Sequence, residues 1–501
     1  MSRTALRALA TIAFLSTTGA CSLFDFLNPS VDNASDASAG TVDTESGVDP
    51  DAGNTAPAAS ATSGSTSPYS GGGGAGDASA GPNVGGDGGK SADANRPPAT
   101  RGPTAATQGV NFPFPQNRES SNCVYPTGYL NQDVQAAYAK WKNDLITSSG
   151  ASGFRRVQRL PSDPGLQVGS TVSEGIGYGM LIAVYMNDQQ LFDDLWKYEQ
   201  LHLGSCPSST CPPMELMDWY ISADGSSALG TGGATDADED MAFALVMADR
   251  QWGGQGSLSK TYKQTAIDQI TAVWVLEVYQ SNLIKPGTWG DSSTVNISYF
   301  APAYYRVFKS YGGTLPMSGG GSWNPDWDSV VNTSYTTLNN ALSAANGNQS
   351  NGLVPAWCTS AGSPNPSALQ SGNPTNYQYD SCRTPFRIGL DWCWNAEARA
   401  KAYVAKTSSF FSGVGASNIV DGYMLDGTPK PQNPGKQSAA FIGPAAVGAM
   451  SESTYQPFLD DAYAAVATDT LFAGGTYYEE SWTVMSLLMM TANFLDYTME
   501  P

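Results

Sequence analysis

The stretch TVSEGIGYGMLIAV, residues 171–184, places one carboxylate directly in front of three glycines and an apolar run. Gly175, Gly177 and Gly179 follow Glu174 at every second position. Each glycine costs about 0.5–1 kcal/mol relative to alanine inside a helix, and a plain helix start does not need them. We therefore predict a buried helix at whose glycine backbone something must come close.

Helical periodicity recurs from Val110 to the end of the chain. Residues 130–146, for example, place Val134, Trp141 and Leu145 on one face, whereas strand-like alternation is scarce. The other segments with this pattern are 175–186, 191–203, 239–251, 261–279, 300–309, 328–345, 386–405, 438–450, 456–469 and 481–495. So many helices exceed a four-helix bundle. They favour an all-α fold of six helical hairpins in a closed ring, with the long loops gathered into an open cleft.

The chain is acidic but sparsely charged, with a net charge of −20 and charged residues at only 14% of its 501 positions. This balance argues against a nucleic acid or an anionic membrane surface as a partner. The chain also has 12 tryptophans, 24 tyrosines and 17 phenylalanines. Aromatic side chains over a polar cleft suit flat, neutral ligands such as sugars, although an aromatic core accounts for most of them.

The N-terminal residues resemble a targeting signal. Arg3 and Arg7 precede a short apolar run, and the small residues Thr18-Gly19-Ala20 lead to Cys21. This ending resembles the lipobox of bacterial lipoproteins, in which Cys21 would carry the lipid, and Ser22 after it favours the outer membrane. An ordinary secretion signal is the alternative. The apolar run is too short for a permanent membrane span.

Composition divides the chain into three parts. Residues 1–21 form the predicted signal peptide. Residues 22–109 are rich in Gly, Ala, Ser and Asp and cannot bury enough apolar surface to fold. We expect them to form a disordered tether for the folded domain, residues 110–501. The expected location is the cell surface or the outer membrane, reached only through the lipid on Cys21, or otherwise the medium as a secreted protein. We expect a monomer.

Cysteine and histidine usage limits the chemistry. Six cysteines remain besides Cys21, and an even number in an exported chain indicates up to three disulfides. Cys206 with Cys211 is the simplest pair, because the loop between them is short. The single histidine, His202, excludes Ser-His-Asp triads and most zinc sites, and we interpret it as a structural residue in a helix.

Acidic motifs are the candidates for chemistry. Ser173 is a good N-cap and puts Glu174 in the first helical turn, where a carboxylate could simply complement the helix dipole. The stretch GGATDADEDMAFALVMADRQW, 232–252, alternates Asp236, Asp238 and Asp240. An EF-hand is excluded, because methionines replace the required glycine and glutamate. We expect Asp236 to lie just outside the helix that follows.

A third motif, YQYDSCRTPFRIGLDWCWN at 377–395, combines a carboxylate with two arginines. Tyr379 and Asp380 precede a predicted helix, and Arg383 and Arg387 follow. A carboxylate next to arginine usually has a lowered pKa and stays ionised, so Asp380 oriented by Arg383 could serve as a base. A purely structural ion pair is the alternative.

These motifs resemble glycoside hydrolase family 8. The series from Ala234-Thr235-Asp236-Ala237-Asp238 to Trp252 is similar to the signature of that family. Further similar blocks follow one another in the family's order: VSEGIGYGM, SYFAPAYYRVF (298–308), NGLVPAW (351–357), Tyr379–Arg387, SAAFIGPAAVGAM (438–450) and YYEESWTVMSLLMMTANF (477–494). The resemblance covers about residues 110–498. It implies an (α/α)6 barrel and an inverting, endo-acting hydrolase of β-1,4-linked glycans, with neither cofactor nor metal.

The resemblance also implies roles for individual residues. Glu174 matches the general acid and Asp380 the general base. Asp236 matches the signature aspartate, which holds the distorted sugar or serves as the alternative base. The implied substrate-binding residues surround the base or line the cleft: Trp219, Tyr379, Arg383, Tyr477 and Tyr478.

The chemistry of inversion agrees with these roles. An inverting enzyme keeps its acid and base about 6.5–9.5 Å apart, with a water between. The acid must be protonated near neutral pH, so Glu174 needs a raised pKa from an apolar or acidic setting, to which an ionised Asp236 would contribute. The glycines after Glu174 would let the glycan pass close to the backbone.

The substrate is the least defined expectation. We expect an endo-1,4-β-glucanase that acts on a plant or microbial polysaccharide, either cellulose or mixed-linkage β-glucan; an endo-xylanase or a chitosanase is the alternative. Cys358 and Cys382 suggest a stapled loop near the cleft that would alter this choice. A non-catalytic surface glycan-binding protein and an accessory of cellulose secretion are rivals of another class. Loss of an acid or base would favour the binding protein, yet all three carboxylates are present.

Overall fold

The computed structural model describes residues 110–204, 216–291, 293–312, 315–316, 322–368, 373–468 and 475–499. Cys21, the predicted tether and the pair Cys206–Cys211 lie outside these residues. Within the described part of the chain, none of the helices combines the length and the apolarity that crossing a membrane requires.

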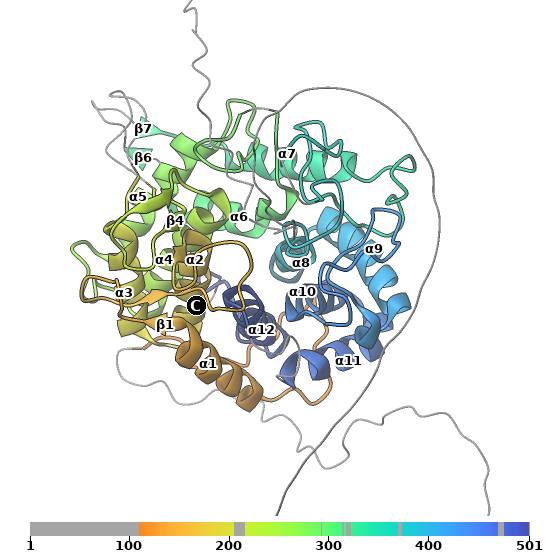
Figure 1. Cartoon of the computed structure of the whole chain (residues 1–501), viewed down its shortest axis with the longest axis horizontal. Coiled ribbons are helices and arrows are strands. Elements are labelled where there is room, and N and C mark those ends of the chain that lie inside the picture. Colours follow the sequence, from red (N-terminus) through yellow and green to blue (C-terminus); the bar gives the residue numbers. More distant parts are fainter. Residues whose placement is uncertain are drawn as a thin grey trace, which may run out of the picture. The chain divides into compact units, whose positions relative to one another are not determined.

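Helices of the described residues form two concentric rings (Figure 1). The inner helices are, in chain order, α2 (Ser173–Tyr185), α4 (Thr235–Gln251), α6 (Pro302–Gly312), α8 (Thr384–Asn395), α10 (Ala439–Ala449) and α12 (Tyr477–Met490). Each inner helix contacts the next, and α12 contacts α2, so the inner ring closes.

The outer helices are α1 (Asn131–Leu145), α3 (Gln189–Gln200), α5 (Tyr262–Glu277), α7 (Trp327–Asn340), α9 (Ala398–Val414) and α11 (Gln456–Ala467). Five of them pack against the inner helix that precedes them in the chain, and α1 packs against α12. The six helical hairpins predicted from the sequence are therefore confirmed as an (α/α)6 barrel.

The loops between the helices contain short strands and 3-10 turns. The strands are β1 (Ile146–Thr147), β2 (Arg156–Val157), β3 (Thr171–Val172), β4 (Tyr220–Ile221), β5 (Ala228–Gly230), β6 (Leu315–Pro316) and β7 (Ser322–Trp323). They pair antiparallel as β1–β2, β3–β4–β5 and β6–β7. The 3-10 turns are η1 (Ile297–Tyr299), η2 (Ala416–Asn418) and η3 (Ser453–Tyr455). In the β3–β4 pair, Val172 lies opposite Tyr220, which fixes the start of α2 beside Trp219.

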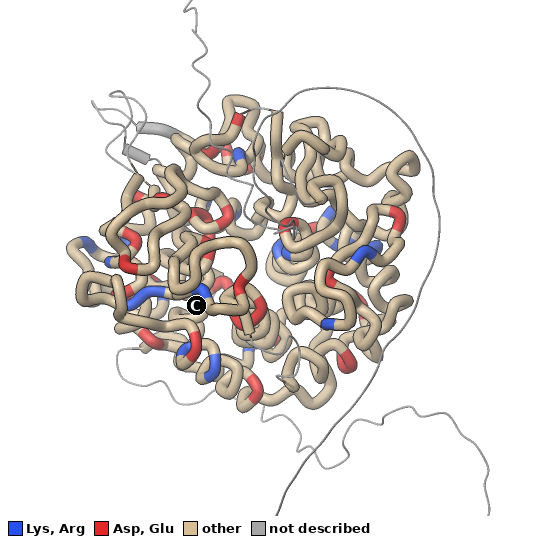
Figure 2. The backbone as a smooth tube through the Cα atoms, in the orientation of Figure 1, with Lys and Arg blue, Asp and Glu red and all other residues tan. Residues whose placement is uncertain are grey.

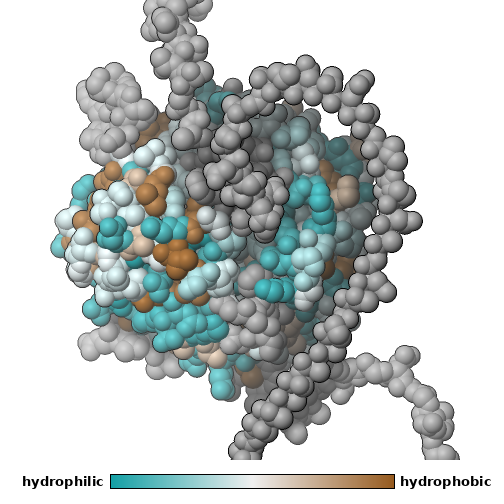
Figure 3. All heavy atoms as spheres, viewed as in Figure 1, coloured by the Kyte–Doolittle hydropathy of each residue, from teal (hydrophilic) through white to brown (hydrophobic). Residues whose placement is uncertain are grey.

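The inner ring is the core of the barrel. In α2, every residue except Glu174 is buried, as predicted from its continuous apolar run. Most of the described residues in Figure 2 are uncharged, and acidic and basic residues both occur near the middle of the ring. On the face shown in Figure 3, apolar residues form small groups among polar ones, as on ordinary protein surfaces.

One predicted helix is in fact two. The segment 386–405 contains α8 and α9, which are separated by Ala396 in the left-handed conformation with φ of 53°. Arg306 of α6 pairs with Asp391 and with Glu397, each at 2.7 Å, so one guanidinium holds both sides of the turn. No glycine or proline marks this break, which is why the pattern of the sequence misses it.

Two helix starts also differ from the prediction. Val172, not Ser173, is the N-cap of α2, and the backbone N–H of Ser173 donates to the Trp219 carbonyl at 2.9 Å. Helix α4 begins at Thr235, so Asp236 lies inside its first turn rather than before it. Glu174 and Asp236 therefore occupy equivalent places at the starts of two neighbouring inner helices.

The described cysteines form one disulfide, which joins Cys123 to Cys393 of α8. Cys358 and Cys382 are buried free thiols, so the predicted stapled loop is wrong. Burial raises the pKa of the Cys358 thiol to about 12. His202 lies just beyond the end of α3 rather than within a helix.

The three glycines of α2 face protein. A Cβ at Gly177 would lie 3.1 Å from the backbone oxygen of Ala237 in α4, and one at Gly179 would lie 2.9 Å from Leu195 of α3. At Gly175 the nearest atom, at 3.3 Å, belongs to Val157 of β2. The prediction that these glycines admit a glycan is therefore wrong. They let β2, α3 and α4 pack closely on α2.

We expect Gly177→Val to lower the free energy of unfolding by about 1–3 kcal/mol, because α2 and α4 must separate to admit the side chain. Gly413→Ala is the matched control: this exposed helical glycine of α9 has nothing within 4 Å of an added Cβ. It should stabilise the protein by up to about 1 kcal/mol. Denaturant unfolding measures both. Unchanged stability with lost turnover in Gly177→Val would contradict the packing role.

Candidate active site

A cleft of about 420 Å³ lies where the inner helices begin. Three inner helices contribute residues of their first turn to its lining: Ser173 and Glu174 of α2, Asp236 of α4, and Tyr477 and Tyr478 of α12. Two others contribute a residue that precedes them, Tyr299 before α6 and Asp380 before α8. A helix N-terminus carries a partial positive charge that favours nearby carboxylates. The closed ring thus brings acidic groups from distant parts of the sequence to one end of the barrel.

Glu174 is the one partly exposed residue of α2, with 17% of its side chain exposed. Its Oε1 accepts hydrogen bonds from Tyr178 Oη at 2.9 Å and from Arg383 Nη1. Its Oε2 accepts one from Tyr477 Oη at 2.7 Å. Burial raises the pKa of the Glu174 carboxyl to about 8, with Arg383 opposing the shift and the charge of Asp236 adding to it. A pKa raised in this way is what a proton donor near neutral pH requires.

Arg383 lies beneath the cleft with 2% of its side chain exposed. Its Nη1 contacts Glu174 Oε1, and it donates to Asp236 Oδ2 at 2.5 Å. Its Nε donates to Ser298 Oγ at 3.0 Å, and the guanidinium lies 4.9 Å from the centre of the Tyr299 ring. One buried cation therefore joins the two carboxylates that begin α2 and α4.

Asp380 is held by a different set of groups. Its Oδ2 accepts hydrogen bonds from Trp357 Nε1 at 3.1 Å and from Gln378 Nε2 at 2.9 Å, and neither bond uses Oδ1. The prediction that Arg383 pairs with Asp380 is wrong, because the hydrogen bonds of Arg383 go to Glu174 and Asp236. Burial raises the pKa of Asp380, against lowering effects of Arg383 and of the two hydrogen bonds, so the lowered pKa expected from the neighbouring arginine is wrong.

The second arginine of this motif serves the core. Arg387 pairs with Glu239 at 3.1 Å and with Asp240 at 2.9 Å, and all three side chains are buried. These ion pairs lie one helical turn from Arg383 and differ from the Asp380–arginine pair that the sequence suggested. Within the described residues, no group of three or more histidine, cysteine or acidic side chains could hold a metal ion.

Comparison with known proteins gives the same family as the motifs. The profile described as "Glycosyl hydrolases family 8" matches residues 113–492. The chain belongs to glycosyl hydrolase family 8. It is therefore a glycoside hydrolase, and its barrel is the fold of that family.

Two curated family members illustrate the similarity. Endoglucanase A of Acetivibrio thermocellus is 37% identical over 368 residues, which cover 72% of this chain and 69% of that protein. The beta-glucanase of Niallia circulans is 30% identical, over 77% of this chain and 92% of that protein.

Solved structures agree with this assignment. The apo beta-1,3-1,4-glucanase from Paenibacillus sp. X4 superposes with a TM-score of 0.66 at 29% identity, covering 77% of this chain and 99% of that one. A cold-adapted family 8 xylanase has a TM-score of 0.60 at 21% identity, covering 76% and 98%, and shares the fold.

Aromatic side chains line the cleft of this family 8 enzyme as predicted. Trp219, Tyr379, Tyr477 and Tyr478 all contribute to its wall. The indole of Trp219 packs onto Gly230, where a Cβ would lie only 2.2 Å from the ring. The Tyr478 hydroxyl donates to the Tyr379 carbonyl at 2.9 Å, so tyrosines of α12 and of the segment before α8 support one another.

Sequence reasoning missed the residues that hold the carboxylates. Trp357 and Tyr178 each lie in a block that matches the family, so the signal was present. Tyr178 contacts Glu174 within one block, whereas Trp357 reaches Asp380 from another block, across 23 positions. A motif within one block does not report such contacts.

We expect Tyr477→Phe to move the alkaline limb of the pH profile of kcat/KM above its wild-type position near pH 8. The hydrogen bond from Tyr477 stabilises the ionised form of Glu174, so its loss raises the pKa of the acid further. Activity is lost as pH rises through that pKa, because the acid must be protonated.

Tyr138→Phe is the matched control, because Tyr138 donates a similar hydrogen bond to Asp188 on the outer ring. Its profile should coincide with that of the wild-type enzyme. A limb that stays in place or moves down in Tyr477→Phe would contradict the assignment of Glu174 as the titrating acid.

Proposed function

We propose that this enzyme is an endo-1,4-β-glucanase that cleaves cellulose or mixed-linkage β-glucan with inversion. One observation carries the chemistry. The carboxyl of Glu174, whose pKa is raised to about 8, shares a cleft with the carboxyl of Asp380. Asp380 is held by other groups, the side chains of Trp357 and Gln378. Two carboxyls in separate environments suit the separate roles of acid and base.

Glu174 acts as the general acid in this proposal. It is protonated at neutral pH and gives its proton to the oxygen of the leaving sugar. Arg383 and the phenols of Tyr178 and Tyr477 then stabilise the carboxylate that remains. The same contacts hold the carboxyl in one orientation before the reaction.

Asp380 is the proposed base. Trp357 and Gln378 anchor its Oδ2, which leaves Oδ1 to accept a proton from the attacking water. Inversion requires a gap of about 6.5–9.5 Å between the two carboxyls to admit that water. Asp236 is the less suitable base, because it shares the Arg383 cation with the acid and its charge raises the pKa of Glu174. Its proposed role is to hold the distorted sugar.

Three features support a neutral β-glucan as the substrate. Family members at 30–37% identity are named endoglucanase and beta-glucanase. The cleft presents aromatic side chains, on which sugar faces pack. It also carries more acidic than basic side chains among its described lining residues, which disfavours polymers of uronic acids.

We expect proton NMR of the full chain acting on cellohexaose to show the α-anomer of the new reducing end first. Inversion of a β-linkage produces that anomer directly, and mutarotation forms the β-anomer later. Polygalacturonic acid is the anionic control and should not be cleaved. Appearance of the β-anomer first would overturn inversion. Cleavage of xylohexaose or a glucosamine hexamer alone would make the enzyme a xylanase or chitosanase, and binding without cleavage would make it a glycan-binding protein.

Two variants in the same assay assign the roles. Glu174→Gln should lose about 10²–10⁴-fold in kcat on cellohexaose but much less on a dinitrophenyl cello-oligoside, whose leaving group needs no proton. Asp380→Asn should lose activity on both substrates, because the water still needs a base. Equal losses for Glu174→Gln on both substrates would remove it from the acid role.

We also propose that the enzyme is exported and anchored at the cell surface by a lipid on Cys21. The targeting pattern before Cys21 supports export, and the Cys123–Cys393 disulfide is typical of an oxidising compartment. Cys21→Ser should move the enzyme from the membrane fraction to the soluble fraction, whereas Ser22→Ala should leave it in place. Equal fractionation of the wild type and Cys21→Ser would favour plain secretion.

A further inference from the structure

A further buried carboxylate, that of Asp421, lies behind one wall of the cleft. Asp421 belongs to the loop between η2 and α10 and is only 1% exposed. Its Oδ1 accepts from the backbone N–H of Gln432 at 2.7 Å and of Asn433 at 3.1 Å. Its Oδ2 accepts from Asn433 Nδ2 at 2.7 Å and from Tyr379 Oη at 3.0 Å. A buried carboxylate is stable only when donors replace its lost water, and here four donors do so.

These donors belong to two segments that line the cleft. Tyr379 directly precedes the proposed base, Asp380. Gln432, Asn433 and Lys436 also line the cleft, and we call residues 432–436 the distal wall. Asp421 therefore connects the segment that carries the base to the distal wall.

The backbone brings these segments together. Tyr377 and Tyr423 exchange two backbone hydrogen bonds, at 3.0 and 2.9 Å, which place residue 421 beside the segment before α8. The chain then turns and returns past Gly422, where a Cβ would lie 2.4 Å from the carbonyl oxygen of Lys430. The carboxylate of Asp421 joins Gln432 and Asn433 of this returning loop segment to Tyr379.

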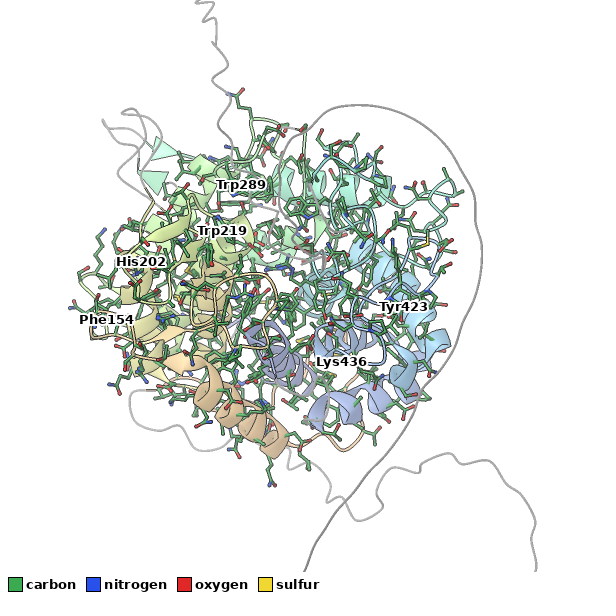
Figure 4. All side chains as sticks on the ribbon, viewed as in Figure 1. Phe154, His202, Trp219, Trp289, Tyr423 and Lys436 are labelled. Carbon is green, nitrogen blue, oxygen red and sulfur yellow. A yellow bond between two sulfur atoms is a disulfide. The ribbon has the colours of Figure 1, made fainter. Side chains whose placement is uncertain are left out.

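The distal wall lies across the barrel from Trp219. It precedes α10, whereas the backbone of Trp219 bonds to Ser173, the first residue of α2, and to Gly232, just before α4. Helix α10 is three positions from α4 in the ring of six. Figure 4 shows Trp219 and Lys436 on opposite sides of the central helices. A glycan that passes over Glu174, Asp236 and Asp380 from Trp219 would therefore reach the distal wall.

We propose that Asp421 is a positioning residue that holds Tyr379 and the distal wall together as a sugar-binding subsite opposite Trp219. The side-chain amide of Gln432 and the side-chain oxygen of Asn433 offer hydrogen bonds of the kind that sugar hydroxyls need. This inference rests on the proposed function, because it assigns a role within the same cleft. In this role Asp421 influences which bond of the glycan is cut and takes no part in the chemical step.

The experiment compares Asp421→Asn with the wild-type full chain on cello-oligosaccharides of three to six units, labelled with ¹⁸O at the reducing end. Mass spectrometry then reports which bond is cut. Asp426→Asn is the matched control, because Asp426 lies in the same loop, is exposed, and accepts from Thr428 N at 2.9 Å. Asp421→Asn should lower kcat/KM on cellohexaose by about 10- to 100-fold, mainly through KM, and should change the position of cleavage. The loss should shrink as the substrate becomes too short to reach the wall.

A purely structural role predicts another outcome. Asp421→Asn would then lose stability or activity equally on short and long substrates, with the wild-type cleavage pattern, and the inference would be overturned. If Asp421→Asn does not fold, Tyr379→Phe and Asn433→Ala each remove one of its donors and should shift the pattern in the same direction. Where the double variant Asp421→Asn, Tyr379→Phe folds, its loss should be smaller than the sum of the single losses, because both changes break one contact.

The inference and the proposed function can fail separately. If the wild-type enzyme does not cut cellohexaose, the proposed substrate is wrong, and the same variants are compared on the hexaose that it does cut. If the wild type cuts cellohexaose and Asp421→Asn keeps both its pattern and its chain-length dependence, only the role of Asp421 is wrong.

Discussion

The buried guanidinium of Arg383 is the contact on which the site depends. It comes from the turn before α8 and reaches two carboxylates, Glu174 on α2 and Asp236 on α4. Without it, two acidic groups would face each other in a largely buried place, and removal of one partner of a buried ion pair costs about 3–5 kcal/mol. With it, the positive charge of Arg383 lowers the pKa of Glu174, against the raising effects of burial and of the charge of Asp236. The acidity of Glu174 therefore depends on charge balance among three inner helices.

Close packing of the inner ring makes this contact possible. Gly177 lets α2 approach the backbone of α4, so that the first turns of both helices lie side by side. The closed ring then aligns the starts of the inner helices around one cleft. A site built on helix termini gains partial positive charge from the helices and shape from the loops. The barrel thus supplies rigidity, and the loops supply the contacts with sugar.

Hydrogen bonds from residues around the cleft hold its carboxyl groups in place. Trp357 and Gln378 direct Asp380, Tyr477 directs Glu174, and Asp421 connects Tyr379 to the far wall of the cleft. Each of these partners is distant in sequence or lies in a loop without periodicity. This division explains how one barrel can keep its chemistry while loop contacts change the preferred chain length or linkage.

The sequence by itself determined the all-α class, the approximate helices, the family and the three carboxyl groups that meet in the cleft. Apolar periodicity is a local property, and family blocks retain their order along the chain, so both are visible without a structure. The break at Ala396, the partner of Arg383 and the role of the α2 glycines were decided only by the tertiary structure. Each depends on which atoms from other helices come within a few ångströms, and spacing along one chain does not contain that information. The raised pKa of Glu174 belongs to the same class, because burial and neighbouring charges, rather than its own segment, set it.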